Sequence, residues 1–190
     1  WFLQSFGVVD GVFQMVEDNN TSLLAAIGNF VAPIFAPLGF GNWKAAVATF
    51  TGLIAKENVV NTFGVLYGFA EVAEDGLEIW ANVAADYTAL TAYSFMLFNM
   101  LCAPCFAAMG AIKREMNSAK WTWFAIGYQC VFAYAISLIV YQLGTVFGGG
   151  GFNVGTVIAI LLVLFIVYML FRKNKYNENH LTIKEKVLES

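Results

Sequence analysis

The sequence is poor in charged residues, which make up 12% of its 190 residues, whereas 59% are hydrophobic. A soluble domain ordinarily carries roughly 25% charged and 45–50% apolar residues, so the composition argues against a soluble globular fold. The 18 phenylalanines, 8 tyrosines and 5 tryptophans exclude a disordered chain, because solvated coils hold few aromatic residues. No basic patch with interleaved aromatics occurs, so nucleic-acid binding has no support.

Residues that carry enzyme chemistry are also scarce. The single histidine, His180, lies alone in a polar tail, so no nucleophile, base and acid can be assembled. The phosphate-binding pattern Gly-x-x-x-x-Gly-Lys-Ser/Thr is absent, and the glycine run at 148–151 has a different spacing. The three cysteines all fall in apolar segments and give no disulfide framework. We therefore expect this chain to be neither an enzyme nor a P-loop NTPase.

Long apolar runs predict an all-α, polytopic membrane protein with about four spanning helices. A spanning helix needs about 20 apolar residues. The segments that meet this length are about 45–69, 88–112, 119–143 and 152–171. A fifth segment, 22–40, contains Pro33 and Pro37, which remove helix hydrogen bonds, so we expect it to be short, kinked or re-entrant. Strict apolar–polar alternation is absent, which argues against an all-β fold.

Four regions follow from this pattern. We expect residues 1–20 to be the end of a preceding hydrophobic segment with an outer loop, since the chain opens without Met or a signal peptide and is interpreted as a fragment. Residues 21–143 are the membrane region with broken helices. Residues 144–171 hold an outer glycine-rich turn and the last spanning helix, and 172–190 form a cytoplasmic tail.

The charges are sorted along the chain. If the spans alternate, one side receives nine basic residues, namely Lys44, Lys113, Arg114, Lys120, Arg172, Lys173, Lys175, Lys184 and Lys186. The other side receives no Lys or Arg and the acidic residues Asp10, Glu17, Asp18, Glu71, Glu74, Asp75, Glu78 and Asp86. The positive-inside rule then places 41–44, 113–118 and the tail in the cytoplasm. The acidic outer loops are either merely solvated, which we favour, or attract cations to a pore mouth.

Two charged residues, Lys56 and Glu57, lie in the middle of the 45–69 segment. A charge at that depth costs at least about 2.5–3.5 kcal/mol, so both are candidate functional residues. On a continuous helix a polar wedge is formed by Glu57, Asn58, Asn61, Thr51 and Thr62, which fall on one face. Lys56 points away from it, towards a second helix or a carbonyl. The Asn and Thr side chains either line a path or hydrogen-bond between helices.

A second polar stretch covers residues 96–105, with the sequence Met-Leu-Phe-Asn-Met-Leu-Cys-Ala-Pro-Cys. Pro104 interrupts the 88–112 helix and frees backbone carbonyls near mid-membrane, where transporter sites often form. The soft donors here are Cys102, Cys105, Met96 and Met100, and Asn99 adds an amide oxygen. Such donors suit transition metals better than Ca²⁺ or Mg²⁺. Packing is an equal alternative for Cys102 and the methionines, whereas Cys105 is favoured as a ligand.

Two further patterns have simpler interpretations. The string Cys-Ala-Pro-Cys resembles a thioredoxin-type redox motif, but that chemistry needs a βαβ context, which is absent. In the third span, a polar seam is formed by Cys130, Tyr134, Ser137 and Tyr141. We expect this seam to pack against the proline-broken helix rather than to line a path.

Two stretches resemble the C-terminal membrane part of ferrous iron transport protein B (FeoB). The first runs Val-Ala-Pro-Ile-Phe-Ala-Pro-Leu-Gly-Phe-Gly-Asn-Trp at 31–43, followed by Thr-Gly-Leu-Ile-Ala-Lys-Glu at 51–57. The second is Ala-Pro-Cys-Phe-Ala-Ala at 103–108, followed by Ile-Lys-Arg-Glu at 112–115 and Lys-Trp at 120–121. The similarity extends in order from Trp1 to about Leu143. It implies that the chain carries the second gate region of that family.

The resemblance implies the permease part of a GTP-dependent Fe²⁺ uptake transporter in the bacterial inner (plasma) membrane, multi-pass, with a cytoplasmic C-terminus. It implies that Cys105 contacts the substrate, Fe²⁺, transiently. From their own chemistry, the soft donor Cys102 and the carboxylate Glu57 are the other candidate contacts on the path. The expected lining residues of the path are Lys56, Asn58, Asn61, Asn99 and Met100. The expected partners are lipid, an N-terminal GTPase domain that binds GTP and Mg²⁺, and a first gate region on the same or a split polypeptide; a homo-oligomer stays open. No cofactor is expected in this chain. The alternatives are a gate-type protein of nucleoside transport or spore maturation, and a structural membrane subunit.

Overall fold

The computed structural model describes residues 5–9, 12–16, 19–56, 58–69 and 79–172. The described part begins with a hairpin of β1 (Phe6–Val9) and β2 (Val12–Met15), paired antiparallel with Phe6 opposite Met15. A 3-10 turn, η1 (Asn19–Thr21), leads into the helical region. Glu57, the acidic residues before Ile79, and the tail beyond Arg172 lie outside the described residues, so their predicted roles stay predictions.

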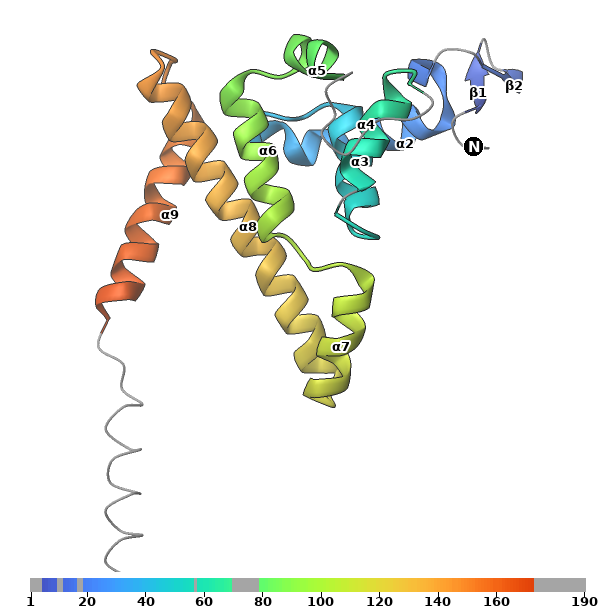
Figure 1. Ribbon diagram of the computed structural model, residues 1–190. Helices are drawn as coiled ribbons and strands as arrows, with labels where there is room; N and C mark the ends of the chain where they lie inside the picture. Colours follow the sequence, from blue (N-terminus) through green and yellow to red (C-terminus); the bar gives the residue numbers. More distant parts are fainter. Residues whose placement is uncertain (1–4, 10–11, 17–18, 57, 70–78, 173–190) are drawn as a thin grey trace, which may run out of the picture.

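All later elements of the described chain are helices (Figure 1). In order they are α2 (Leu23–Phe35), η2 (Ala36–Leu38), α3 (Trp43–Gly52), α4 (Asn58–Leu66), α5 (Trp80–Asp86), α6 (Ala89–Leu101), α7 (Phe106–Met116), α8 (Ala119–Phe147) and α9 (Val154–Phe171). Side chains of Ser22, Asn42 and Thr88 cap the N-termini of α2, α3 and α6, each accepting a backbone N–H. Such caps satisfy donors that a helix leaves unpaired in its first turn.

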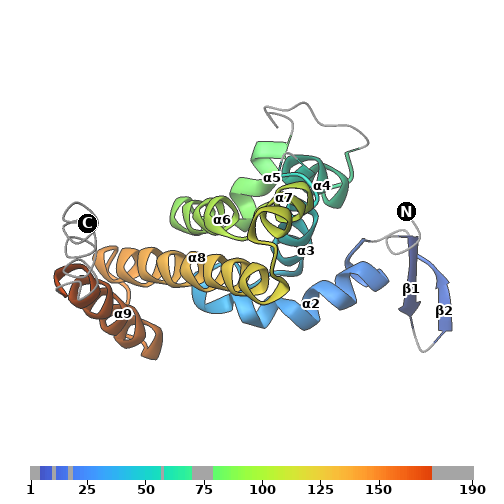
Figure 2. The same ribbon diagram turned by 90° about the horizontal axis from the view of Figure 1, so that it is seen from below.

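Three segments are long and apolar enough to cross a membrane: Ala89–Met116, which contains α6 and α7, then α8, and then α9. A further pair, Leu23–Leu38 and Trp43–Gly52, passes the same test together but is bent by 93°. It is a broken span or a re-entrant loop. The predicted all-α polytopic class is confirmed, and so is the kinked or re-entrant nature of segment 22–40. In Figure 2, α6 and α7 lie on one side of α8, and α9 lies on its other side.

The prediction of one continuous span at 45–69 is wrong. α3 ends at Gly52, the chain turns, and α4 runs back beside α3 as an antiparallel hairpin. The face of α3 that is buried carries small residues, namely Ala45, Ala46, Ala48, Thr49 and Gly52. Small side chains let two helices approach closely, and the hydroxyls of Thr51 and Thr62 then meet at 2.8 Å across the hairpin. The predicted polar wedge is therefore divided between two helices.

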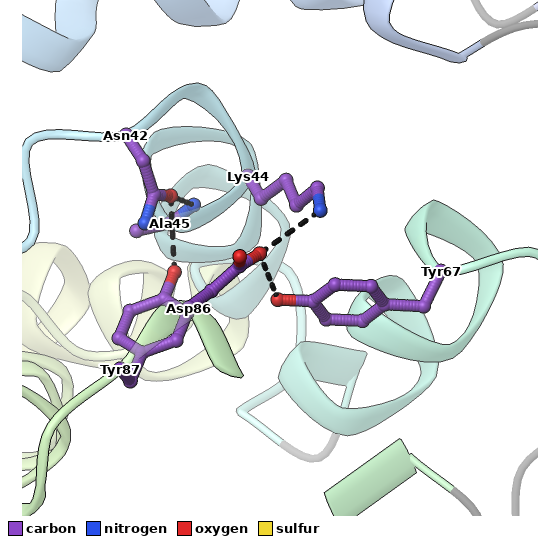
Figure 3. A network of polar contacts seen from close by, with 6 residues as sticks. All are labelled: Asn42, Lys44, Ala45, Tyr67, Asp86 and Tyr87. Carbon is purple, nitrogen blue, oxygen red and sulfur yellow. Dashed lines mark hydrogen bonds and ion pairs between the residues drawn. The ribbon is translucent and has the colours of Figure 1, made fainter. Parts of the chain in front are cut away.

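A polar network closes the open end of the α3–α4 hairpin (Figure 3). The Asp86 carboxylate accepts hydrogen bonds from Lys44 Nζ at 3.0 Å and from the Tyr67 hydroxyl at 2.7 Å. The Tyr87 hydroxyl donates to Asn42 Oδ1 at 3.0 Å. The sorting of charges had placed Lys44 and Asp86 on opposite sides of the membrane, and their ion pair contradicts that. Because the hairpin starts and ends at the same end of the bundle, it does not change sides.

The network also sets the protonation of its members. Burial of Asp86 opposes its ionisation, but the hydrogen bonds from Tyr67 and Lys44 outweigh burial and hold its pKa below the ordinary value. Burial and the hydrogen bond to Asp86 raise the pKa of the Tyr67 hydroxyl, which stays a donor. Since folding lowers the Asp86 pKa, its stabilisation is present at neutral pH and is lost as acid protonates the folded carboxylate.

The core lies where the bend after α2 meets α6 and α8. The rings of Phe35, Phe40, Phe95 and Phe98 contact one another, with centroids 5.2–5.9 Å apart. Two side chains donate to backbone carbonyls of the bend at 2.8 Å, namely Ser94 to Leu38 and Gln142 to Pro37, and Tyr134 donates at the same distance to Ile34 in the last turn of α2. The Tyr141 ring lies against Gly39, whose φ of +92° a side chain would strain. The prediction that the seam on α8 packs is confirmed for Tyr134 and Tyr141.

Gly28→Ala is expected to destabilise the protein, because an added Cβ would lie 2.9 Å from the Trp43 carbonyl oxygen and 3.0 Å from Trp43 Cβ. Forcing a methyl group into a packed contact costs about 1–3 kcal/mol. The matched control is Gly110→Ala on α7, where nothing lies within 4 Å of an added Cβ. Thermal unfolding in detergent should show a lower Tm for Gly28→Ala alone. Equal Tm values would contradict the close packing of α2 on α3.

Exchanging the charges of Lys44 and Asp86 tests whether they share one side. Lys44→Asp and Asp86→Lys should each lower the Tm, because each brings like charges together. The double exchange should be more stable than the two single effects predict, by about 0.2–1 kcal/mol, as is usual for a partly exposed pair. The measurement is a double-mutant cycle of unfolding in detergent. Purely additive effects would contradict the ion pair and reinstate a 45–69 segment that crosses the membrane.

Candidate functional site

Two interruptions of helical structure meet within the bundle. The first is the tip of the α3–α4 hairpin at 53–56, and the second is the segment 102–105 between α6 and α7. The tip reaches the level of the α6–α7 break in Figure 1. Two hydrogen bonds join them: Phe106 N donates to the Leu53 carbonyl at 3.1 Å, and Lys56 Nζ donates to the Met100 carbonyl at 3.0 Å.

Each hydrogen bond compensates for a specific loss. In a continuous helix the Met100 carbonyl would accept from residue 104, but Pro104 has no N–H to give. The Lys56 ammonium takes that place, at the negative end of the α6 dipole. Phe106 opens α7, so its N–H has no partner inside the helix and bonds to Leu53 instead. The predicted break at Pro104 and the prediction that Lys56 reaches a carbonyl are both confirmed.

A cavity of about 10 Å³ lies between the two breaks, which is room for about one water molecule or small ion. Its lining residues are Thr49, Gly52, Leu53, Lys56, Asn99, Cys102 and Ala103. Thr49 is 5% exposed, and its hydroxyl has no hydrogen-bond partner among the described residues. Asn99 uses its amide nitrogen to bond Phe95 O at 2.9 Å, which leaves its oxygen available as an acceptor. Oxygen and sulfur donors thus surround a space of ionic size.

The three thiols are free and half-buried, but they are not equivalent. Cys102 lines the cavity, and its Sγ lies 3.7 Å from Sγ of Cys130 on α8. Cys105 is the N-cap residue of α7 and does not belong to the cavity lining. Sequence reasoning missed Cys130 as a partner of Cys102. The spacing of the seam predicts on which face of α8 Cys130 lies, but not which residue of α6 it lies opposite. Across the described residues, no three His, Cys, Asp or Glu side chains gather as a metal site.

The remaining predicted lining residues are placed unevenly. Lys56 and Asn99 reach the cavity together with Cys102. Asn58 is half-buried at the start of α4, and its carbonyl accepts from Thr62 Oγ1 at 2.7 Å. Asn61 is exposed on α4, and Met100 is 75% exposed, so that only its carbonyl joins the site. Hydropathy alone could not separate these positions, because it does not show which way the hairpin turns.

Known proteins resemble most of this chain. A family model described as "Gate: Nucleoside recognition" matches residues 1–119. The Fe(2+) transporter FeoB of Staphylococcus aureus is 38% identical over 129 residues, which cover 67% of this chain and 18% of that protein. That of Methanocaldococcus jannaschii is 34% identical over 148 residues, covering 76% and 21%. A Fe(2+) transport protein A/Fe(2+) transporter FeoB fusion protein of Porphyromonas gingivalis is 34% identical over 142 residues, covering 70% and 17%.

The matched segments span about a fifth of the length of these relatives. No solved structure matches the chain. The family match covers both breaks that face the cavity, the hairpin tip at 53–56 and the segment 102–105, and continues to the start of α8. The described chain is thus a multi-pass helical membrane segment whose two cavity-facing breaks lie within the family match. It belongs to the Gate family, with Fe(2+) transporters FeoB among its relatives.

Proposed function

We propose that this chain is the membrane gate part of a Fe²⁺ uptake permease, and that the ion passes between the hairpin tip and the α6–α7 break. The observation that carries this proposal is the contact of two chain breaks around a cavity of ionic size. Transporters commonly bind ions where helices are broken near the bilayer midplane. The names of the relatives as Fe(2+) transporters support the choice of ion.

The donors at the breaks suit a passing ion. Fe²⁺ accepts both sulfur and oxygen ligands, and the cavity offers the Cys102 thiol with neutral oxygens of Asn99 and Thr49. Cys105, beside the break, is proposed as a further transient contact, and so is Glu57. The neutral oxygens of Asn99 and Thr49 are weak ligands, which suits a permeation site that must release its ion as readily as it takes it.

In this proposal Lys56 holds the gate closed. Its ammonium bridges the hairpin tip to the α6 carbonyl that an entering cation would also seek. A cation and an ammonium repel one another, so the ion passes once Lys56 has left the Met100 carbonyl. The sections of the relatives beyond the match would supply a GTPase domain with its GTP and Mg²⁺ and a first gate region. The protein would reside in the plasma membrane with a cytoplasmic C-terminus.

Nucleoside transport is a second candidate, favoured by the description of the family model. A nucleoside needs room for a base and a sugar, together with several hydrogen-bond partners. The cavity at the breaks is far too small for it. A larger pocket of about 220 Å³ between α4, α5 and α6 is lined almost wholly by apolar side chains, among them Val60, Phe63 and Phe95. The described part of the chain therefore favours an ion over a nucleoside.

Uptake by cells that produce the protein from its complete reading frame tests the proposal. Radiolabelled Fe²⁺ should enter and radiolabelled uridine should not. Asn99→Leu should lower Fe²⁺ uptake about tenfold, since losing roughly 1.4 kcal/mol of ion binding has that effect. Cys105→Ser should lower it as well, because a hydroxyl is a harder donor than a thiol. Tyr128→Phe, on the exposed face of α8, is the matched control. Entry of uridine without Fe²⁺ would replace this proposal with the second candidate.

The closure by Lys56 has its own test. Lys56→Met keeps the length of the side chain but removes its hydrogen bond, worth about 1.5–3 kcal/mol for a charged donor. The tip should then separate from the break more often, and Cys102 should react faster with a maleimide, as measured site by site with mass spectrometry. Lys120→Met, at an exposed position on α8, should change nothing. Unchanged reactivity of Cys102 in Lys56→Met would show that Lys56 does not hold the gate closed.

A further inference from the structure

A pair of cysteine thiols joins the helix break to α8. Cys102 ends α6 as its C-cap residue, and Cys130 lies on α8, 28 residues later in the chain. Their Sγ atoms are 3.7 Å apart, and neither sulfur is in a disulfide. The motif around Pro104 points to Cys105, so nothing so far gives Cys130 a role beyond packing.

The separation of the two sulfurs has a chemical meaning. Two thiolates bound at about 2.3 Å to one tetrahedral cation lie about 3.8 Å apart. The thiols of Cys102 and Cys130 therefore stand at the spacing of a chelating pair before any ion arrives. Cys102 and Cys105, which are adjacent in the motif, are divided in the fold between the end of α6 and the start of α7.

The surroundings of Cys102 favour a cation. The C-terminal end of α6 carries the negative end of the helix dipole, and the Met100 carbonyl there attracts the Lys56 ammonium, which has to move away before a metal ion enters. The cavity that Cys102 lines also holds the buried Thr49 hydroxyl, which has no partner among the described residues. A buried polar atom without a partner is costly unless a water or an ion completes it.

We propose that Cys102 and Cys130 form a two-thiolate subsite for a divalent transition-metal cation. This inference rests on the proposed function for the identity of the cation, which is then Fe²⁺ bound transiently on its path. Binding breaks two S–H bonds and forms two metal–sulfur bonds, and the two protons leave with water. Two positive charges enter as two leave, so the net charge of the buried site stays the same. That balance matters within a membrane, where an uncompensated charge is expensive. It also favours a divalent cation over a monovalent one.

Co²⁺ titration of the purified full-length protein tests the pair, because thiolate-to-cobalt charge-transfer absorption grows with the number of bound thiolates. All variants carry Cys105→Ser, so that Cys102 and Cys130 are the two thiols left within these 190 residues. This parent should show a two-thiolate band. Adding Cys102→Ser or Cys130→Ser should halve the band and weaken Co²⁺ binding at least about tenfold, the loss seen even for an outer-shell partner of a metal. Ser137→Ala, at a buried position on the same seam, should leave the band unchanged.

The outcomes separate this inference from the proposed function. If Cys130→Ser leaves the absorption band of the parent intact, the proposal of a Cys102–Cys130 metal subsite is overturned. It is also overturned if Co²⁺ does not bind and mass spectrometry finds a disulfide between Cys102 and Cys130. Fe²⁺ uptake is measured in parallel with Cys130→Ser alone. Uptake at the wild-type level would remove the pair from the path and leave the permease standing. A two-thiolate band in a protein that transports no Fe²⁺ would keep the metal subsite and overturn the permease.

Discussion

The structure depends on one constraint: a backbone N–H or C=O freed inside a membrane needs a partner within the protein, because the bilayer core offers no water. Among the described residues, three helix interruptions lie within the bundle, namely the bend after α2, the hairpin tip and the α6–α7 break, and the constraint is met there in two ways. At the bend after α2, side chains of α6 and α8 bond to the freed carbonyls, with Ser94 and Gln142 donating to Leu38 and Pro37. At the hairpin tip and the α6–α7 break, each interruption supplies the partner of the other. The first solution is fixed by packed side chains, whereas the second is made between two elements that can separate.

That difference explains why the gate is proposed at the second place. The bend after α2 is surrounded by four phenylalanine rings and by Ser94, which is fully buried, so its bonds cannot break without opening the core. The tip and the break are joined by one backbone bond and one charged bond beside a small polar cavity. Those bonds together are worth about 2–4 kcal/mol on typical values. A free-energy difference of that size keeps a closed state dominant, and yet binding of an ion or of another part of the protein can reverse it.

The sequence predicted the features that depend on composition along one helix. Apolar runs and the position of Pro104 were enough to predict α8, α9 and the break between α6 and α7. It failed where two segments of similar hydropathy fold against each other, because a window over 45–69 sums α3 and α4 into one apparent span. The same error placed Lys44 and Asp86 on opposite sides of the membrane, because a spanning helix at 45–69 adds one membrane crossing between the two residues. Glycine and alanine on the buried face of α3 were the available signal, because a close helix hairpin requires small residues and a lone span does not.

The candidate site was predictable residue by residue but not as a constellation. Lys56, Asn99 and Cys102 were identified because polar and soft side chains stand out in apolar segments, and the fold brings all three to one cavity. Thr49 and Cys130 were not identified as site residues, because a threonine and a cysteine are ordinary packing residues until their neighbours are known. What the sequence cannot contain is the axial offset between α6 and α8, on which the contact of the two sulfurs depends. Ser94 Oγ donates to the carbonyls of Leu38 and Ser137 and so joins α6 to the bend after α2 and to α8, and the Phe95 ring packs on Phe40 of the same bend. The break satisfied by packed side chains thus holds α6 against α8, next to the break that is proposed to open.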